Sequence, residues 1–274
     1  MASSPSTESD SAAPQLTVEQ AIANLKQTED KGDRYYAAWW LGRFNVAEPD
    51  AIAALLTALK DEGDRDSEGG YPLRRNAARA LGKLGDPQVI PALIACLDCA
   101  DYYVREAAAQ SLASLEATEA IPELVALLAG GVEAAVEVPG KPHLVQPYNA
   151  ILEALGDLNA QEAASLVEAF LGHSVVQVKN AAARAMYQLS GENHYTQPLL
   201  DTLTCDDLQL RRSTLLDLGE IGYLPAAEAI AETLAENSIK LIALKGVLET
   251  HIERSQSHLT KDSQRVMKLM DSLL

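Results

Sequence analysis

Apolar residues recur along most of the chain at positions i, i+3, i+4 and i+7, the spacing that places them on one face of an α-helix. This pattern predicts a first set of amphipathic helices. The earliest runs from Thr17, a suitable N-cap, to Lys26. The others start near Ala51, Gln88, Glu119, Ala160, Tyr195 and Pro225.

A second pattern lies between these segments. An apolar residue, a basic residue, two variable residues and an Ala-Ala pair lead to a final Leu. LRRNAARAL from Leu73, VREAAAQSL from Val104 and VKNAAARAM from Val178 show it most clearly, with weaker copies elsewhere. The seven copies end at Leu41, Leu81, Leu112, Leu155, Met186, Leu218 and Val247. Successive ends are 40, 31, 43, 31, 32 and 29 residues apart, so the basic period is close to 31.

Two alternating kinds of helix at a fixed period are the signature of a repeat protein, in which each helical pair buries its apolar face on the next. We therefore predict an all-α fold, an alpha-alpha superhelix. It is a HEAT-like or armadillo-like solenoid of about seven helical pairs, continuous as one domain over residues 15–274. Paired alanines such as Ala77 and Ala78 allow neighbouring helices to approach closely.

Short polar residues and glycine mark the predicted helix ends. Gly85 suits the left-handed position after a helix, Asp86 an N-cap and Pro87 the first turn of the next helix. Asp33, Asp101 and Ser174 are predicted caps of second helices.

The two long intervals in the repeat indicate insertions, near residues 61–72 (DEGDRDSEGGYP) and 130–146 (GGVEAAVEVPGKPHLVQ). Both fall between the first and second helices of a pair, so we expect them on the same edge of the solenoid. Loops on a rigid scaffold often carry function, and surface insertions are also simply tolerated. Both interpretations stay open.

Composition narrows the possible functions. Apolar residues make up 47% of the chain, and the net charge of −17 argues against nucleic-acid binding, which needs basic patches. Residues 1–14 are Ser/Pro-rich without an apolar core, which predicts a disordered tail rather than a signal peptide. No apolar run is long enough to span a membrane, so we expect a soluble intracellular protein.

Cysteine and histidine give no metal signature. Cys96 and Cys99 form a C-x-x-C, but Cys96 lies on an apolar helix and no second ligand pair exists, which favours structural burial. The histidines are scattered, so no metal site is predicted.

The aromatic block Tyr35, Tyr36, Trp39 and Trp40 contains both tryptophans of the protein. Residues four apart share a helix face, so Tyr36 groups with Trp40 and Tyr35 with Trp39. One pair can pack in the core while the other lines a groove. Alternatively, all four rings close the first repeat as a cap.

Arginines follow the first insertion directly. Arg75 and Arg79 are i, i+4 neighbours and suit carboxylate ligands. Arg74 occupies a basic position shared by other repeats, where we expect pairing with neighbouring Asp residues. The residues in that position are Arg34, Arg74, Arg105, Lys179 and Arg211.

Two segments carry a family resemblance. RYYAAWWLGRF, residues 34–44, and YPLRRNAARALGKLGD, residues 71–86, resemble the E subunit of the E/F-type phycobilin lyases of cyanobacteria. The resemblance implies a HEAT-like cytoplasmic subunit that forms a heterodimer with an F-type subunit. The pair would attach phycocyanobilin by a thioether bond to a cysteine of the phycocyanin alpha subunit, and take part in the reverse step. It implies no true cofactor, since the bilin is the substrate, and transfers no catalytic motif.

The residues fit such a substrate, which has two propionates, pyrrole N–H groups and an extended π-system. We expect Arg75 and Arg79 to hold the propionates and Tyr36 and Trp40 to stack on the rings. The bilin-binding candidates are Arg75, Arg79, Tyr36, Trp40, Glu68 and Tyr71, and the catalytic candidates are Tyr36, Asp64 and Asp66. Two alternatives remain open: a non-catalytic HEAT-like scaffold, and a lyase-isomerase or chromophore chaperone.

Overall fold

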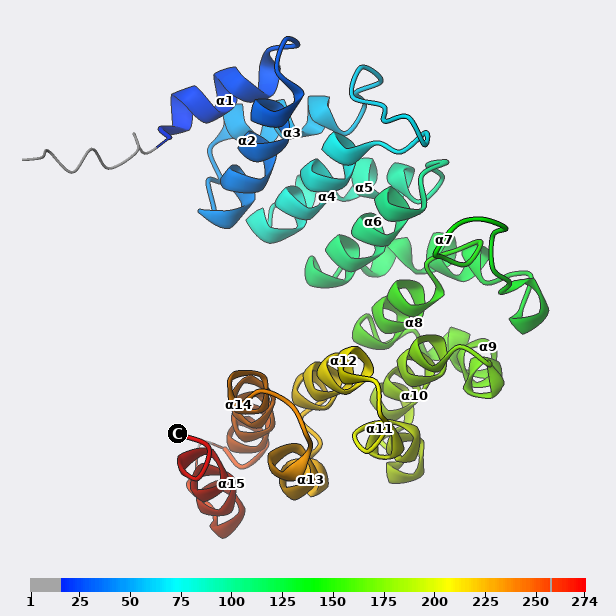
Figure 1. Ribbon diagram of the computed structural model, residues 1–274, viewed down its shortest axis with the longest axis vertical. Helices are drawn as coiled ribbons and strands as arrows, with labels where there is room; N and C mark the ends of the chain where they lie inside the picture. Colours follow the sequence, from blue (N-terminus) through cyan, green and yellow to red (C-terminus); the bar gives the residue numbers. More distant parts are fainter. Residues whose placement is uncertain (1–15, 257) are drawn as a thin grey trace, which may run out of the picture.

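The computed structural model describes residues 16–256 and 258–274, which form fifteen α-helices joined by short turns and 3-10 segments (Figure 1). The predicted tail at residues 1–14 lies outside the described residues. The first helices of the pairs are α1 (Val18–Lys26), α3 (Pro49–Ala58), α5 (Ile90–Cys96), α7 (Ile121–Leu127), α9 (Ala164–Ala169), α11 (Gln197–Thr202) and α13 (Ala227–Glu232). The second helices are α2 (Lys31–Arg43), α4 (Pro72–Leu84), α6 (Tyr102–Ser114), α8 (Tyr148–Asp157), α10 (Val176–Ser190), α12 (Leu208–Glu220) and α14 (Asn237–Arg254), and α15 (Lys261–Asp271) follows the last pair.

The seven pairs stack into a crescent, which confirms the predicted all-α solenoid (Figure 1). The second helices line the inner, concave side and the first helices lie outside. Within the described residues the β-pairing consists of one isolated bridge between Glu137 and Leu144. No helix in the described part of the chain is both long and apolar enough to cross a membrane.

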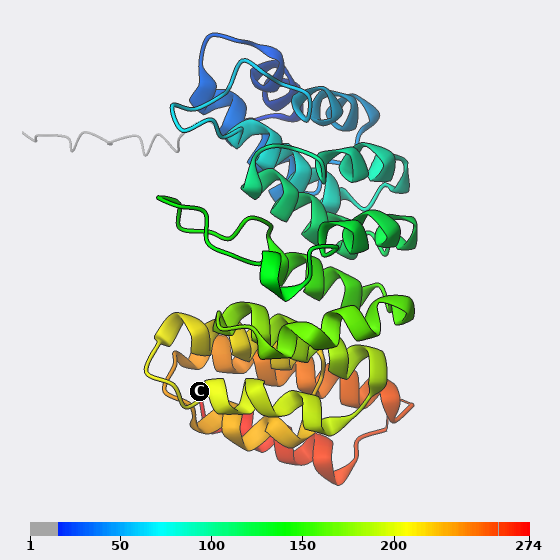
Figure 2. The ribbon, with the colours of Figure 1, turned by 90° about the vertical axis from the view of Figure 1, so that its right-hand side faces the viewer.

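Both insertions project from the same edge of the stack, as predicted (Figure 2). They leave the solenoid just before α4 and α8 and bring their tips together beside the N-terminal ends of α4 and α6. This edge is where the chain departs most from a plain repeat.

The predicted helix ends are correct in most places. Thr17 forms a capping box with Gln20, Gly85 adopts φ 73° after α4, and Asp101 caps α6. Two cap predictions are wrong. Asp30 caps α2, because the helix begins one turn earlier than expected and takes Asp33 into its first turn. Ser174 is also displaced, since α10 begins after Val175 and has no side-chain cap.

Glycine allows the inner helices to approach one another. Gly42 of α2 lies against Ala80 of α4, and a Cβ built on Gly42 would stand 2.7 Å from the Ala80 Cα. Gly219 of α12 and Gly246 of α14 meet in the same way further along. Gly42 and Gly219 each directly follow the final Leu of a repeat, so the sequence pair Leu-Gly marks where two inner helices touch.

The apolar core falls into two blocks. One runs from α1 to α10, and the second from the end of α10 to α15, with Leu171 and Tyr187 packed against both. At the seam the buried Asn180 amide donates to the hydroxyls of Thr202 and Thr214, each at 3.1 Å. Packing at the seam therefore includes side-chain hydrogen bonds with defined geometry.

The C-terminal helix α15 covers the open end of the stack. Val266 is fully buried, and α15 packs on α13 and α14. The helix therefore acts as the cap that a terminal repeat requires.

The basic residue shared by the second helices was predicted to pair with Asp side chains, and the structure supports this only in part. Arg34 does pair with Asp61, at 2.5 Å, but Arg105 and Arg211 donate mainly to backbone carbonyls. The Arg105 guanidinium, for example, reaches the carbonyl of Cys99 at 2.6 Å. The arginines in this position therefore fasten loop backbone beside their helices, because the turns offer carbonyls without partners of their own.

Candidate functional site

Arg75 stands at the junction of two hollows. Its guanidinium donates to the Tyr35 hydroxyl at 3.2 Å and lies 5.5 Å from the centre of the Tyr103 ring. Tyr35 comes from α2, Arg75 from α4 and Tyr103 from α6, so three successive inner helices meet here. On one side lies a pocket beneath the insertions, and on the other a hollow on the inner face.

The first hollow, here called the edge pocket, has a volume of about 690 Å³. It is enclosed by the first insertion, the second insertion and the N-terminal ends of α4 and α6. Its principal polar and aromatic lining residues are Asp66, Glu68, Tyr71, Arg75, Asp101, Tyr102, Tyr103, Arg105, Lys141 and His143. This volume lies within the range of about 300–1,000 Å³ typical of small-molecule sites.

The two insertions hold each other over the edge pocket. The Lys141 ammonium of the second pairs with the Glu68 carboxylate of the first at 2.8 Å, and this contact raises the pKa of Lys141. Within the first insertion the Asp66 carboxylate accepts hydrogen bonds from the backbone N–H groups of Glu68 and Gly70. Asp66 and Glu68 thus shape the rim of the pocket as well as charging it.

Aromatic rings form one wall of the edge pocket. The His143 ring stacks on Tyr102 with 4.2 Å between ring centres, and Tyr103 meets both rings edge-on. Burial raises the pKa of Tyr102 to about 12, so its phenol stays protonated and can donate a hydrogen bond. Tyr71, another predicted binding residue, also lines this pocket. Its ring is covered by the Arg74 guanidinium at 4.0 Å.

The second hollow, here called the inner hollow, has a volume of about 300 Å³ and lies between α2 and α4. It is lined chiefly by Tyr35, Trp39, Asn76, Arg79 and Lys83. Arg79 is held 3.7 Å from the Glu106 carboxylate of α6, whose pKa is raised by burial. The inner hollow therefore combines aromatic surface with positive charge, in an otherwise acidic protein.

The aromatic block is arranged differently from the predicted grouping. Tyr36 stacks on Trp39 with 5.5 Å between ring centres, and both are exposed, at 49% and 45%. Trp40 instead packs against the core and against Phe44 at 4.9 Å. Tyr36 therefore pairs with Trp39, three residues on, and not with Trp40 as predicted. The reason is that Trp40 is turned toward the first repeat while Trp39 faces the inner side.

All but one of the other predicted site residues line one of the two hollows. Arg75, Glu68, Asp66 and Tyr71 come together in the edge pocket, and Arg79 lines the inner hollow. Asp64 lines neither. It is buried at the base of the insertion, 3.8 Å from Lys31, and burial raises its pKa. Its position is that of a residue that shapes the loop.

Sequence reasoning missed the second insertion's contribution and the first turn of α6. Lys141 and His143 come from PGKPHL, and Tyr102 and Tyr103 follow the cap Asp101. The available signal was positional: two insertions on one edge must approach the helix N-termini between them. Nothing in the local sequence specifies that His143 stacks on Tyr102.

The inner face continues beyond these hollows as a stripe of one side chain per repeat. Each member lies two positions before the final residue of its repeat, and the stripe is defined as Trp39, Arg79, Gln110, Glu153, Arg184, Leu216 and Lys245. Trp39 and Arg79 line the inner hollow. Gln110, Glu153 and Arg184 line an acidic pocket of about 450 Å³. Leu216 and Lys245 line a groove of about 370 Å³ between α12 and α14.

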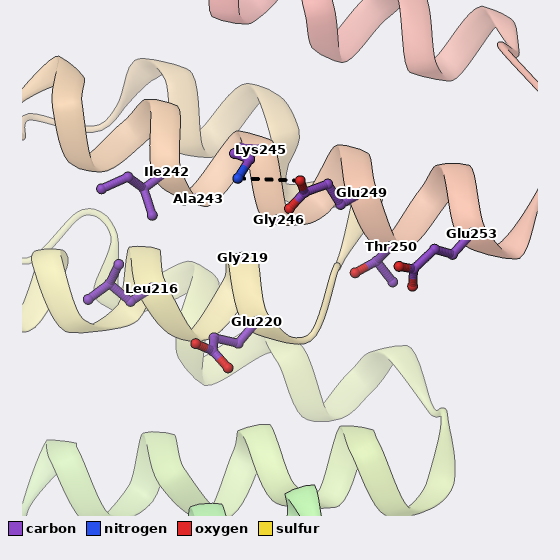
Figure 3. Close-up of a pocket in the computed structure, with 10 residues that line it drawn as sticks. All are labelled: Leu216, Gly219, Glu220, Ile242, Ala243, Lys245, Gly246, Glu249, Thr250 and Glu253. Atoms are coloured by element: carbon purple, nitrogen blue, oxygen red, sulfur yellow. Dashed lines mark ion pairs between the residues drawn. The ribbon is translucent and has the colours of Figure 1, made fainter. Parts of the chain in front are cut away.

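Figure 3 shows the α12–α14 groove at the C-terminal end of this inner stripe. Gly219 and Gly246 form its floor, and Lys245 pairs with Glu249 at 3.4 Å along α14. Glu220 points from α12 toward the neighbouring α10, and it also lines the acidic pocket. Glu220 therefore lines both the groove and the acidic pocket.

Known proteins resemble this chain in both fold and sequence. A model of HEAT repeats matches residues 18–113 and 65–137. The chain is 59% identical over 265 residues to phycocyanobilin lyase subunit alpha of Synechocystis sp. (strain ATCC 27184 / PCC 6803 / Kazusa), covering 95% of this chain and 97% of the relative. It is 42% identical over 249 residues to the bilin biosynthesis protein PecE of Mastigocladus laminosus, covering 90% and 87%.

A solved structure extends the match to three dimensions. The complex of CpcE and CpcF of phycocyanin lyase from Nostoc sp. PCC7120 contains a chain 57% identical to this one, with a TM-score of 0.89. The match covers 98% of this chain and 100% of that one. Fold and sequence together define a HEAT-repeat subunit of a bilin lyase. More particularly, the chain belongs to the phycocyanobilin lyase subunit alpha family. The family resemblance of residues 34–44 and 71–86 is thereby confirmed.

Proposed function

We propose that this chain, with an F-type partner subunit, attaches phycocyanobilin through a thioether bond to a cysteine of the phycocyanin alpha subunit, and takes part in the reverse step. The relatives named phycocyanobilin lyase subunit alpha support the substrate, and the solved complex of CpcE with CpcF supports the heterodimer. The reaction belongs in the cyanobacterial cytoplasm, where phycobilisomes are assembled. The bilin is the substrate, and no other cofactor is required.

The observation that carries the bilin-binding proposal is the position of Arg75 between the two hollows. A phycocyanobilin offers two carboxylates on a flat π-system. Arg75 and Arg79 supply guanidiniums for the carboxylates, since guanidinium–carboxylate hydrogen bonds are charge-assisted and bidentate. Trp39 on one side and Tyr103 on the other supply ring faces, which suit a flat pigment.

The acidic rim completes the chemistry of the edge pocket. Asp66 and Glu68 are acceptors for pyrrole N–H groups, and Lys141 is a further cation for a propionate. The nucleophilic thiol belongs to the acceptor protein, so this subunit contributes binding and orientation. Holding two reactants in the reactive geometry can lower a barrier by about 7–11 kcal/mol.

Reconstitution tests the proposal. The full chain is co-expressed with an F-type subunit, phycocyanobilin and apo-phycocyanin alpha, and ligation is followed by the absorption of the covalent product. The double variant Arg75→Ala/Arg79→Ala should slow ligation at limiting bilin by about 10- to 100-fold, since one hydrogen bond to a charged group contributes about 1.5–3 kcal/mol.

Arg254→Ala is the matched control. Arg254 is an exposed arginine near the end of α14, outside both hollows. A wild-type ligation rate in the double variant would reject the propionate role. Failure of the wild-type chain to ligate with any F-type partner would reject the lyase proposal itself.

A further inference from the structure

Glu153 occupies the centre of the inner stripe. It lies on α8 and lines the acidic pocket, together with Asp157 of the same helix, Arg184 of α10 and Glu220 of α12. The pocket is about 450 Å³ in volume and opens on the concave side. The residues discussed so far for bilin binding lie outside it.

The acidic pocket contains more carboxyl groups than its cation can neutralise. Arg184 is 6% exposed, and its guanidinium lies 2.8 Å from Asp157, 3.3 Å from Asp217 and 3.6 Å from Glu220. Three carboxylates therefore share one buried arginine. In the described part of the chain no cationic nitrogen lies within 4.0 Å of the Glu153 carboxyl. Glu153 is a fourth carboxyl without a counterion of its own.

The cluster also has an unused donor. The Nε of Arg184 is buried and makes no hydrogen bond, although this side chain is more than nine-tenths buried and lines the acidic pocket. A buried polar atom without a partner is costly unless a ligand or water satisfies it. The pocket thus combines an unsatisfied buried donor with a carboxyl group that lacks a counterion.

The surplus of carboxyl groups affects the pKa of Glu153. Burial is the largest cause that raises the pKa of Glu153, to about 8, and the charges of Asp217, Asp157 and Glu106 act in the same direction while Arg184 opposes them. These groups come from every inner helix around Glu153: α6, α8, α10 and α12. Glu153 is therefore largely a neutral acid near pH 7, with a proton to give.

We propose that Glu153 is the acid that gives a proton to the bilin on the inner face, while the neighbouring carboxylates stabilise the resulting cation. This rests on the proposed lyase function. Glu106 connects the acid to the bilin-binding residues, since its carboxylate lies 3.7 Å from Arg79 and its charge acts on Glu153.

Protons and electrons balance in the proposed ligation step. Protonation of the tetrapyrrole by Glu153 draws electrons away from the exocyclic double bond. The acceptor sulfur then bonds to the outer carbon of that double bond, the π bond breaks, and the proton already on the tetrapyrrole shifts from nitrogen to the ring carbon. The proton lost by the thiol returns Glu153 to its acid form. The sum is addition of S–H across one double bond, with no oxidant or reductant.

The test uses the full chain with its F-type partner and two readouts. In the first, phycocyanobilin is bound in the presence of an acceptor whose cysteine is replaced by serine, and the absorption spectrum is recorded against pH. Wild type should lose the red-shifted band of protonated bilin as pH rises through about 8. Glu153→Gln should show no transition there while binding the pigment with unchanged affinity.

In the second readout, ligation rates are measured against pH with the native acceptor. Glu153→Gln should be about 100-fold slower at neutral pH, the usual contribution of a general acid, and should lack the decline above pH 8. Glu153→Asp should recover part of the rate. Glu123→Gln, which alters an exposed carboxylate on the outer helix α7, is the matched control.

Each outcome decides the question. A wild-type spectrum and pH profile in Glu153→Gln would overturn the acid role, even with ligation intact. If that variant fails to assemble, Glu153→Asp decides, because an unshifted pH profile in that variant would also reject the role. Absence of ligation by wild type is a separate result, which counts against the lyase proposal instead.

Discussion

The N-terminal end and the middle of the inner stripe use the same repeat position for opposite chemistry. At the N-terminal end Trp39 and Arg79 create an aromatic, positively charged hollow. In the middle Glu153 and Arg184 create a pocket in which carboxyl groups outnumber the cation. The comparison teaches that a repeat fixes where a side chain points, while its identity is free to vary, so a regular scaffold can hold a graded charge pattern.

The largest effect is expected from removing the cation of the acidic pocket. Arg184→Met leaves the largely buried carboxylate of Asp217 without a counterion and removes the partner of the more exposed Asp157, which should destabilise the protein by about 3 kcal/mol at pH 7. Urea unfolding of the variant and of Arg79→Met measures the difference. Arg79 is the equivalent arginine near the N-terminal end of the stripe and is half exposed, so its loss should cost far less. Equal losses would contradict the comparison.

The close approach of inner helices should be equally sensitive at both ends. Gly42→Val and Gly219→Val each force a side chain into backbone less than 3 Å away, which should cost about 1–3 kcal/mol as overpacking does. Thermal unfolding measures this cost. Gly172→Ala, where a Cβ meets nothing within 4 Å, should leave the melting temperature almost unchanged.

A smaller effect is expected on how the stability of the protein depends on pH. The pKa of Glu153 is raised from 4.5 to about 8 in the folded protein, so the folded state binds more protons than the unfolded state between these values. Stability contributed at this site is therefore present below pH 4.5 and is lost as pH rises through 8. Glu153→Gln should remove this loss and stabilise the protein by about 1–2 kcal/mol at pH 8, less than the full linkage of 1.36 kcal/mol per pKa unit because the carboxyl cluster can relax.

Melting temperatures of wild type and Glu153→Gln at pH 5 and pH 8 give the measurement. The variant's advantage should grow with pH. An advantage that is the same at both values would show that burial of the side chain, rather than its titration, sets the difference.

The smallest effect is expected at the loop edge. Lys141→Gln removes the ion pair with Glu68, and exposed pairs contribute little to global stability. The melting temperature should hardly change. Amide exchange in residues 61–72 should become faster, because the first insertion loses its tie to the second, and protection equal to wild type would show that the ion pair does not order the loops.

The fold could be predicted almost completely because it depends on local patterns. The apolar residue at the end of each repeat, the small residues beside it and caps such as Asp101 act within one or two turns of chain. The failures at Asp33 and Ser174 arose where two residues of similar capping ability lie near each other, or where a helix begins without a side-chain cap.

The candidate site could be predicted only in part, since it depends on where loops go. Arg75 and Glu68 were recognisable from their place beside an insertion, and the structure brings them into one pocket. The stacking of His143 on Tyr102 depends on the path of a long loop, which no period governs. Glu153 was overlooked because its unusual environment comes from three other helices, although its register in the repeat was readable.

The seam between the two core blocks has a mechanical consequence. Across this joint the inner helices α10 and α12 pack against each other less extensively than any other successive pair of inner helices. The hydrogen bonds from Asn180 to Thr202 and Thr214 therefore carry much of the connection between the two blocks. The width of the crescent's opening changes most easily at this joint, so small motions at one place let the inner face adjust to a partner seated inside.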